Sequence, residues 1–147
     1  MPADAYADSS FLVSIYRQDG NHGAAYSFMM KYQPILAFLP LHHVELRNAL
    51  RFAETQQLLT REDRRQTFGQ IEKDLEDGLL LHLAISWNNI CRRADELGEK
   101  HMVRNGLRTI DLLHVAAALE CKLETFLSFD QRQRAFAKAA GLRVKPS

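Results

Sequence analysis

Five short strand-like runs, separated by segments of helical pattern, constrain the fold of this chain more than any other feature. The runs are AYA at 5–7, ILAFL at 35–39, LLLHLA at 79–84, TFLSF at 125–129 and LRVK at 142–145. Strands that alternate with helices favour a parallel sheet, because parallel strands are joined by long crossovers whose helices cover both faces. We therefore predict an α/β fold, a three-layer α/β/α sandwich around a central parallel sheet of about five strands, in one domain over residues 1–147.

The helices between these runs have recognisable ends. Thr60, Ser86 and Thr109 are of residue types that cap helix N-termini, and Gly141 is suited to close the last helix. Helices are predicted at 9–16, 21–31, 43–59, 61–77, 87–102 and 110–119, with a last one that ends before Gly141.

The composition excludes several classes of protein. No apolar run approaches the roughly 20 residues that a membrane helix needs, and the first residues, MPADAYADSS, lack the basic and apolar regions of a secretory signal. Cys91 and Cys121 are not spaced like zinc ligands or a disulfide framework, and both are expected to be buried. We expect a cytoplasmic protein.

The segment RTIDLLHVAAAL at 108–119 raises the first functional question. Every residue from Ile110 to Leu119 is apolar except Asp111 and His114, so a helix here has no face left for water. Burial of an ionised carboxylate is costly unless a cation or several donors compensate. The free amide groups and dipole of the first helical turn give Asp111 part of that compensation.

Two further aspartates directly follow predicted strands. Asp8 lies in YADSS and Asp130 in LSFDQ, and each has a serine two residues away, Ser10 and Ser128. Residues that follow parallel strands meet in the crevice at the carboxyl edge of the sheet, where ligands bind in open α/β folds. Either aspartate alone is better explained as a helix N-cap, and it is the presence of two alike that favours a shared site.

A fourth acid, Glu45, comes shortly after the second predicted strand. In LHHVELRNALRF it shares a helix face with Ala49 and Phe52, which places it at the edge of an apolar stripe. The alternative is an exposed glutamate in the first turn of its helix, stabilised there by the helix dipole.

Convergence of the four acids would create a metal site. Like charges close together raise one another's pKa values until some carboxylates are protonated, unless a divalent cation is bound. Because the ligands are carboxylate oxygens without Cys or paired His, Mg²⁺ or Mn²⁺ fits best, and such an ion orients a phosphodiester and activates water. His114, one turn after Asp111, is expected to be a buried core histidine or to support a metal ligand rather than bind the ion itself.

The chain resembles the PIN-domain family, metal-dependent ribonucleases that include the VapC toxins of toxin–antitoxin systems. The resemblance is carried, in the family's order, by DSS at 8–10, VELRNAL at 44–50, RNGLRTIDLLHVAAAL at 104–119 and FLSFDQRQRAFAKAAGLRV at 126–144. It implies a PIN-like sandwich and a metal-dependent endoribonuclease. The family's acidic quartet, which holds Mg²⁺ or Mn²⁺ and carries catalysis, then falls on Asp8, Glu45, Asp111 and Asp130.

The resemblance also implies supporting residues and partners. Ser10 matches the hydroxyl after the first acid, and Ser128 stands where the family often has Thr or Asn. Family members cut RNA and often form homodimers, and toxin members are silenced by a cognate antitoxin. Residues 100–147 carry nine basic and four acidic side chains, which suits a polyanionic partner. Four arginines beside the acids are candidates for binding the RNA backbone: Arg104, Arg108, Arg132 and Arg134.

Several other interpretations remain open at this level. A phosphatase of the haloacid-dehalogenase type needs an aspartate where Ser10 stands, and a receiver domain needs an early acidic pair and a late lysine. Neither pattern is evident in the sequence, so both classes are disfavoured. A PIN-like scaffold could bind RNA or a protein partner without cleavage. A purely structural domain could use all four acids as helix caps.

Overall fold

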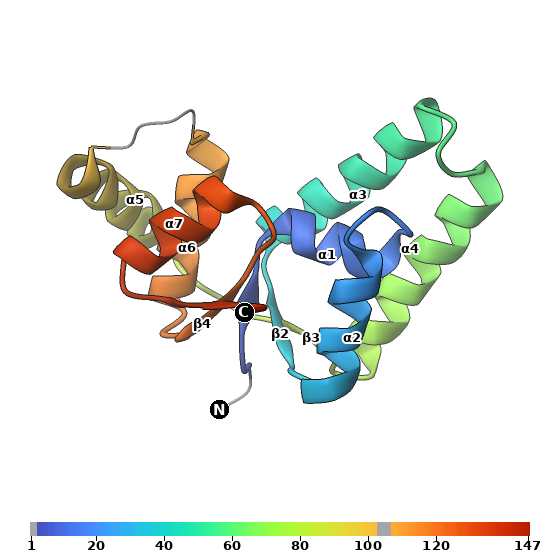
Figure 1. The fold of residues 1–147 in the computed structure, drawn as a ribbon, viewed down its shortest axis with the longest axis horizontal. Helices are drawn as coiled ribbons and strands as arrows, with labels where there is room; N and C mark the ends of the chain where they lie inside the picture. The colour runs from blue at the N-terminus through green and yellow to red at the C-terminus, as the bar shows by residue number, and fades with distance from the viewer. Residues whose placement is uncertain (1–2, 103–106) are drawn as a thin grey trace.

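A computed structural model describes residues 3–102 and 107–147 of the chain. The elements in these ranges alternate between strand and helix along most of the chain (Figure 1). In order they are β1 (Tyr6–Ala7), α1 (Ser9–Tyr16), α2 (His22–Tyr32), β2 (Leu36–Phe38), α3 (Pro40–Thr55), α4 (Arg61–Glu76), β3 (Leu80–His82), α5 (Trp87–His101), α6 (Thr109–Glu120), β4 (Thr125–Leu127), α7 (Gln131–Ala139) and β5 (Arg143–Lys145).

All five predicted strands are present, and every pairing between them is parallel. Two ladders form, ordered β1-β4-β5 and β2-β3. A parallel bridge between Ala5 and Leu36 links the ladders, so the strands follow the spatial order β3-β2-β1-β4-β5. The α/β prediction is confirmed, although the sheet is divided into two ladders because β1 is only two residues long.

Strand residues point alternately to two buried faces, which produces the three layers. Tyr6 and Phe126 belong to a core that α5, α6 and α7 cover, whereas Ala7 and Leu127 belong to a core covered by α1 to α4 (Figure 1). Apolar residues at consecutive strand positions are typical of parallel sheets with helices on both sides. This explains why the strands appear in the sequence as continuous apolar runs.

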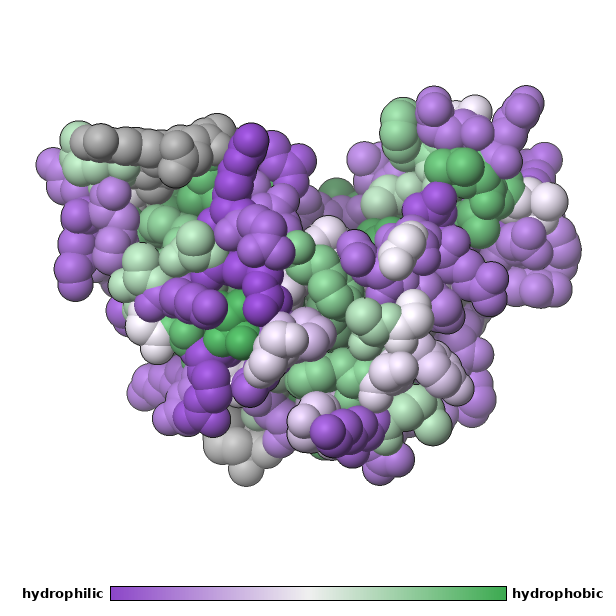
Figure 2. Space-filling view, viewed as in Figure 1, coloured by the Kyte–Doolittle hydropathy of each residue, from purple (hydrophilic) through white to green (hydrophobic). Residues whose placement is uncertain are grey.

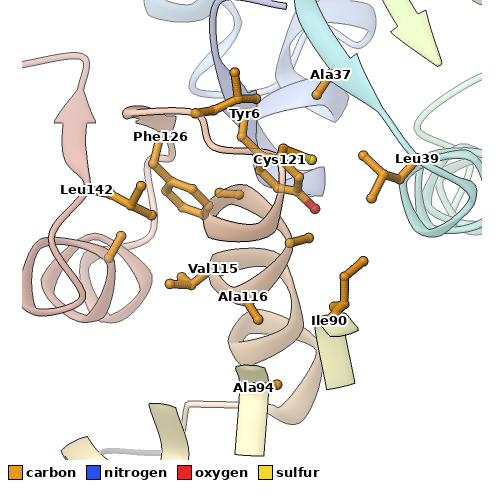
Figure 3. Close-up of a cluster of buried hydrophobic side chains, with 14 of the residues drawn as sticks. Tyr6, Ala37, Leu39, Ile90, Ala94, Val115, Ala116, Cys121, Phe126 and Leu142 are labelled. Carbon is orange, nitrogen blue, oxygen red and sulfur yellow. The ribbon is translucent and has the colours of Figure 1, made fainter. Parts of the chain in front are cut away.

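The core under α5 and α6 brings large and small side chains together (Figure 3). The Tyr6 ring lies beside α6, and Val115 and Ala116 of that helix face the same cluster as Ile90 of α5. Short side chains on α6 allow a close approach to α5, and the two helices pack along one another. The pattern of RTIDLLHVAAAL is therefore that of a helix inserted between a sheet and another helix.

Some predicted boundaries are wrong. Thr60 and Ser86 cap α4 and α5 as predicted, but α6 begins at Thr109 itself, and its N-cap is Arg108. The helix predicted at 43–59 spans Pro40–Thr55, because proline is well suited to a first helical turn. Cys91 is exposed, contrary to the prediction, while Cys121 is buried. Within the two described ranges, no helix is both long and apolar enough to cross a membrane.

Candidate active site

Four acidic side chains from four separate elements line one pocket. Asp8 follows β1, Glu45 belongs to α3, Asp111 to α6, and Asp130 precedes α7. The pocket has a volume of about 60 Å³, which is room for an ion with a few waters. In Figure 2 the surface is hollowed between the α3–α4 pair and the α6–α7 side, at the edge where α1 begins (Figure 1). The structure thus brings together all four acids that the sequence singled out.

Asp8 is held rigidly by its role as the N-cap of α1. Its Oδ1 accepts hydrogen bonds from the backbone N–H of Phe11 at 2.8 Å and from the Ser10 hydroxyl at 2.9 Å. Burial raises the pKa of Asp8, and hydrogen bonds from Ser128, Phe11 and Ser10 offset only part of that effect. Ser10 therefore supports the first acid, as the resemblance implied.

Asp130 is the exposed member of the group and caps α7, with Oδ1 accepting from the backbone N–H of Gln133 at 3.0 Å. Ser128 is buried between this acid and Asp8. Its hydroxyl accepts from the backbone N–H of Asp130 at 3.1 Å, and the same hydroxyl lowers the pKa of the Asp8 carboxyl group. One serine therefore connects the two acids that follow β1 and β4.

Glu45 does not lie in the first turn of its helix. Because α3 begins at Pro40, Glu45 is in the second turn, and its side chain is only 26% exposed. Its Oε1 accepts from the Ser9 hydroxyl and contacts Nε2 of His114, both at 2.5 Å. Burial by itself raises the pKa of Glu45, but the bonds from His114 and Ser9 outweigh it and leave the pKa below its usual value. The interpretation as an exposed first-turn glutamate is wrong.

Asp111 is paired with the guanidinium group of Arg108, which lies three positions earlier in the chain. Its Oδ2 accepts from Nε of Arg108 at 3.2 Å and from the Arg108 backbone N–H at 3.3 Å, while Oδ1 accepts from Nη2 at 3.3 Å. The Asp111 side chain is 17% exposed and that of Arg108 is 74% exposed. The carboxylate in the apolar helix is thus compensated by an ion pair at the rim of the pocket.

The pKa values do not follow the mutual elevation that like charges alone predict. The pKa of Asp8 is raised because the side chain is buried, and that of Glu45 is lowered because His114 and Ser9 hydrogen-bond it. Burial of Asp8 and the hydrogen bonds to Glu45 therefore account for these two pKa shifts, and repulsion among the acids does not.

His114 takes the supporting position that the sequence suggested. It is buried, its Nε2 faces Glu45 and lies 3.2 Å from Oγ of Ser9, and its Nδ1 lies 2.7 Å from the Tyr6 hydroxyl. Sequence reasoning missed Ser9 and Tyr6. The local signal for Ser9 was its place directly after Asp8 in YADSS, whereas Tyr6 had none, because Tyr6 and His114 are 108 positions apart.

The four candidate arginines have different surroundings. Arg134 donates from Nη1 and Nη2 to the carbonyl oxygens of Ser128 and Pro146, both at 2.7 Å, so it fixes the C-terminal segment. Arg108 contacts Asp111, and Arg132 is exposed at the start of α7. Arg104 lies outside the described residues.

The donor set matches a hard divalent cation, since the pocket offers carboxylate and hydroxyl oxygens and no thiolate. Among residues 3–102 and 107–147, however, no three His, Cys, Asp or Glu side chains are close enough to hold an ion as they stand. The contacts explain this, because Arg108 binds both oxygens of Asp111 while helix caps hold Asp8 and Asp130. Joint binding by the four carboxylates therefore requires Arg108 to leave Asp111.

The fold and this pocket define an α/β domain whose acidic site lies at the carboxyl edge of a parallel sheet. The sequence matches the PIN domain family over residues 5–140, and the chain belongs to that family. No curated protein matches the sequence.

Solved structures with a similar fold extend over almost the whole chain. VapC20 from Mycobacterium tuberculosis, described as a sarcin-ricin loop cleaving toxin, has a TM-score of 0.69 and 15% identity over 97% of this chain and 100% of its own. PAE2754 from Pyrobaculum aerophilum has a TM-score of 0.62 and 22% identity over 98% and 90%. VapBC2 from Rickettsia felis, bound to a promoter DNA fragment, has a TM-score of 0.59 and 13% identity over 96% of each chain. At these identities the likeness establishes the fold alone.

Proposed function

We propose that this protein is a divalent-metal-dependent endoribonuclease, a hydrolase of RNA phosphodiester bonds that acts as the toxin of a toxin–antitoxin pair. The observation that carries the proposal is the meeting of Asp8, Glu45, Asp111 and Asp130 in one pocket. Membership of the PIN family supports nuclease activity. The VapC neighbours support the toxin role and a cognate antitoxin, whereas the homodimer and the cytoplasmic location stay predictions from the sequence.

A purely structural role does not explain all four acids. Asp8 and Asp130 do cap helices, and Asp111 lies in the first turn of α6. Glu45 caps no helix, yet it is half-buried against the side chains of Ser9 and His114. A partly buried carboxylate at a position with no capping function points to a role in the pocket.

The pocket residues divide into ligands and supports. Mg²⁺ or Mn²⁺ held by the four carboxylates would supply a Lewis acid for the phosphodiester and lower the pKa of water at the site. Asp8 is kept in place by Ser10 and Ser128, and Glu45 by Ser9 and His114. Arg108, once turned away from Asp111, and the exposed Arg132 offer cations to RNA phosphates.

One observation favours a second candidate function, that of a scaffold that binds RNA or a protein partner without cleavage. The Arg108 guanidinium lies against Asp111 at the rim of the pocket. There it neutralises part of the negative charge that would attract a divalent cation. If this contact persists in solution, the acids act as an internal ion-pair network and not as metal ligands.

Cleavage of a mixed RNA pool separates the two functions. With Mn²⁺ or Mg²⁺ present, we expect the purified protein to convert long RNA into shorter fragments, and chelation of the metal with EDTA is expected to stop the reaction. The products are read on denaturing gels, and filter binding on the same samples reports RNA association. RNA that is bound but remains intact at every metal concentration would support the scaffold and contradict the nuclease.

A further inference from the structure

A buried group of aromatic and imidazole side chains lies beneath the pocket, and part of it has no role in the proposed chemistry. Tyr6 is fully buried, and its ring stacks on Phe126 with centroids 5.8 Å apart and planes inclined by 7°. The same ring lies 4.6 Å from that of His42 and 5.6 Å from that of His114, measured between centroids. Packing on three sides fixes where the Tyr6 hydroxyl can point.

The two neighbours of the His114 ring determine which of its nitrogens carries the hydrogen when the ring is neutral. The Glu45 carboxylate accepts at Oε1, so Nε2 of His114 carries the hydrogen that points to it. In the neutral imidazole Nδ1 is then an acceptor, and the Tyr6 hydroxyl donates to it at 2.7 Å. Burial raises the pKa of Tyr6 well above its usual value, so the phenol keeps the proton that it donates.

His42 has a similar arrangement but its partners lie in the backbone. Its Nδ1 accepts from the N–H of Leu39 at 3.0 Å, and its Nε2 donates to the carbonyl of Ala7 at 2.8 Å. Burial lowers the pKa of His42 to about 3, so this ring is neutral. His42 is therefore an uncharged ring that packs against Tyr6, and both of its nitrogens are bonded to the backbone and not to the acids.

Glu45 depends on side chains for its position more than the other acids do. Asp8, Asp111 and Asp130 each accept a hydrogen bond from a backbone N–H, whereas the bonds to Glu45 come from the side chains of Ser9 and His114. A backbone donor is placed by the fold, but a side-chain donor must itself be oriented. His114 is oriented at its far nitrogen by Tyr6.

We propose that Tyr6 is a positioning residue for the active site, which acts through His114 to hold the Glu45 carboxylate toward the ion. The inference rests on the proposed metal-dependent function and adds to it a residue that does not touch the pocket. Partners that orient a ligand in this way typically change metal affinity or activity by about 10- to 100-fold when removed. Tyr6 acts one residue further from the ion, so we expect a change near the lower limit.

The test uses two tyrosine-to-phenylalanine variants of the full chain. Tyr6→Phe removes only the hydroxyl and keeps the ring that stacks on Phe126. Tyr16→Phe is the matched control, because the Tyr16 hydroxyl also donates to a carboxylate, that of Asp74 at 2.6 Å, and does not line the pocket. Circular dichroism confirms that both variants are folded before the measurements.

Two readouts are compared. In the metal-free protein, nitrogen-15 NMR of the histidine rings is expected to show His114 with hydrogen on Nε2, and Tyr6→Phe is expected to give a mixture of ring states. In Mn²⁺ titrations followed by electron paramagnetic resonance, Tyr6→Phe is expected to raise the dissociation constant by about 10-fold. Tyr16→Phe is expected to leave both readouts unchanged. A wild-type ring state and wild-type Mn²⁺ affinity in Tyr6→Phe would overturn the proposal.

Variants of His114 keep the proposal testable if Tyr6→Phe folds poorly. A glutamine amide nitrogen can reach the place of Nε2 and donate to Glu45, whereas an asparagine amide can reach only the place of Nδ1. We expect His114→Gln to retain more Mn²⁺ affinity than His114→Asn. Equal Mn²⁺ affinity in the two variants contradicts the proposal that His114 positions Glu45 through a hydrogen bond from Nε2.

The Mn²⁺ titrations distinguish an error in the role of Tyr6 from an error in the proposed function. If the wild-type protein binds no Mn²⁺, both the metal-dependent function and the relay from Tyr6 through His114 to Glu45 are wrong. If the wild-type protein binds Mn²⁺ and Tyr6→Phe binds it equally well with an unchanged His114 ring, the relay alone is wrong.

Discussion

Replacement of Asp8 by asparagine is expected to remove RNA cleavage while the protein stays folded. The variant keeps an oxygen that accepts from Phe11 and Ser10, and asparagine caps helices as well as aspartate does. It loses the negative charge that a cation requires. A bound metal contributes several kcal/mol to a phosphoryl transition state, and a loss of about 3–4 kcal/mol corresponds to a rate decrease of about 10²- to 10³-fold.

The same substitution is expected to stabilise the metal-free protein. Folding raises the pKa of Asp8 because the carboxyl group is buried. A group of this kind stabilises the fold at low pH, and that contribution is lost as the pH rises through the folded-state pKa. The ionised form of Asp8 is therefore destabilising, and the gain in the free energy of unfolding from Asp8→Asn should increase as the pH rises through the folded-state pKa of Asp8. Urea denaturation at several pH values measures this gain.

Two comparisons complete this prediction. Asp111→Asn is expected to reduce cleavage to a similar degree, whereas Asp63→Asn changes an exposed acid on α4, outside the pocket, and is expected to have no effect on cleavage. Initial rates of RNA cleavage at saturating Mn²⁺ provide the measurement. Equal rates for Asp8→Asn and the wild-type protein contradict the assignment of the pocket.

Replacement of Phe126 by alanine is expected to have the largest effect on stability. Phe126 is fully buried in β4 between β1 and β5, where it stacks on Tyr6. A large cavity in such a place costs about 3–5 kcal/mol, which is a large part of the 5–15 kcal/mol that typically separates folded from unfolded protein. We expect a correspondingly lower urea midpoint for Phe126→Ala.

The control for this prediction is Phe52→Ala on α3. Phe52 is 63% exposed, so its removal leaves no internal cavity and is expected to change the free energy of unfolding by less than about 0.5 kcal/mol. Similar losses for the two phenylalanine variants contradict the described core.

The sequence predicted the architecture well because the relevant signals are local. Apolar runs at consecutive positions, as at Leu36–Phe38, indicated strands buried on both faces, and Thr60 and Ser86 marked helix starts by the chemistry of a single residue. Thr109 failed as a cap because Asp111 competes for the same helix end and accepts from the backbone N–H of Arg108. Local rules do not decide between two neighbouring capping residues.

The sequence identified the acids of the site and some of the residues that support them, but not Ser9 and Tyr6. Asp8 directly follows β1 and Asp130 lies in the short connection after β4, so the geometry of a parallel sheet brings them to one edge. The bond from Ser9 to Glu45 joins residues 36 positions apart and depends on how α1 and α3 pack together, which local sequence patterns do not specify. The contact of Arg108 with Asp111 depends on a rotamer, which sequence patterns do not specify.

Anomalous X-ray scattering from crystals soaked in Mn²⁺ shows whether one divalent ion binds among the four acids. We expect an anomalous peak in the pocket, about 2 Å from carboxylate oxygens of Asp8 and Asp111 and close to Glu45 and Asp130, with the Arg108 side chain turned away from Asp111. A well-ordered pocket that shows no peak and retains the Arg108–Asp111 ion pair at high Mn²⁺ concentration would contradict this expectation.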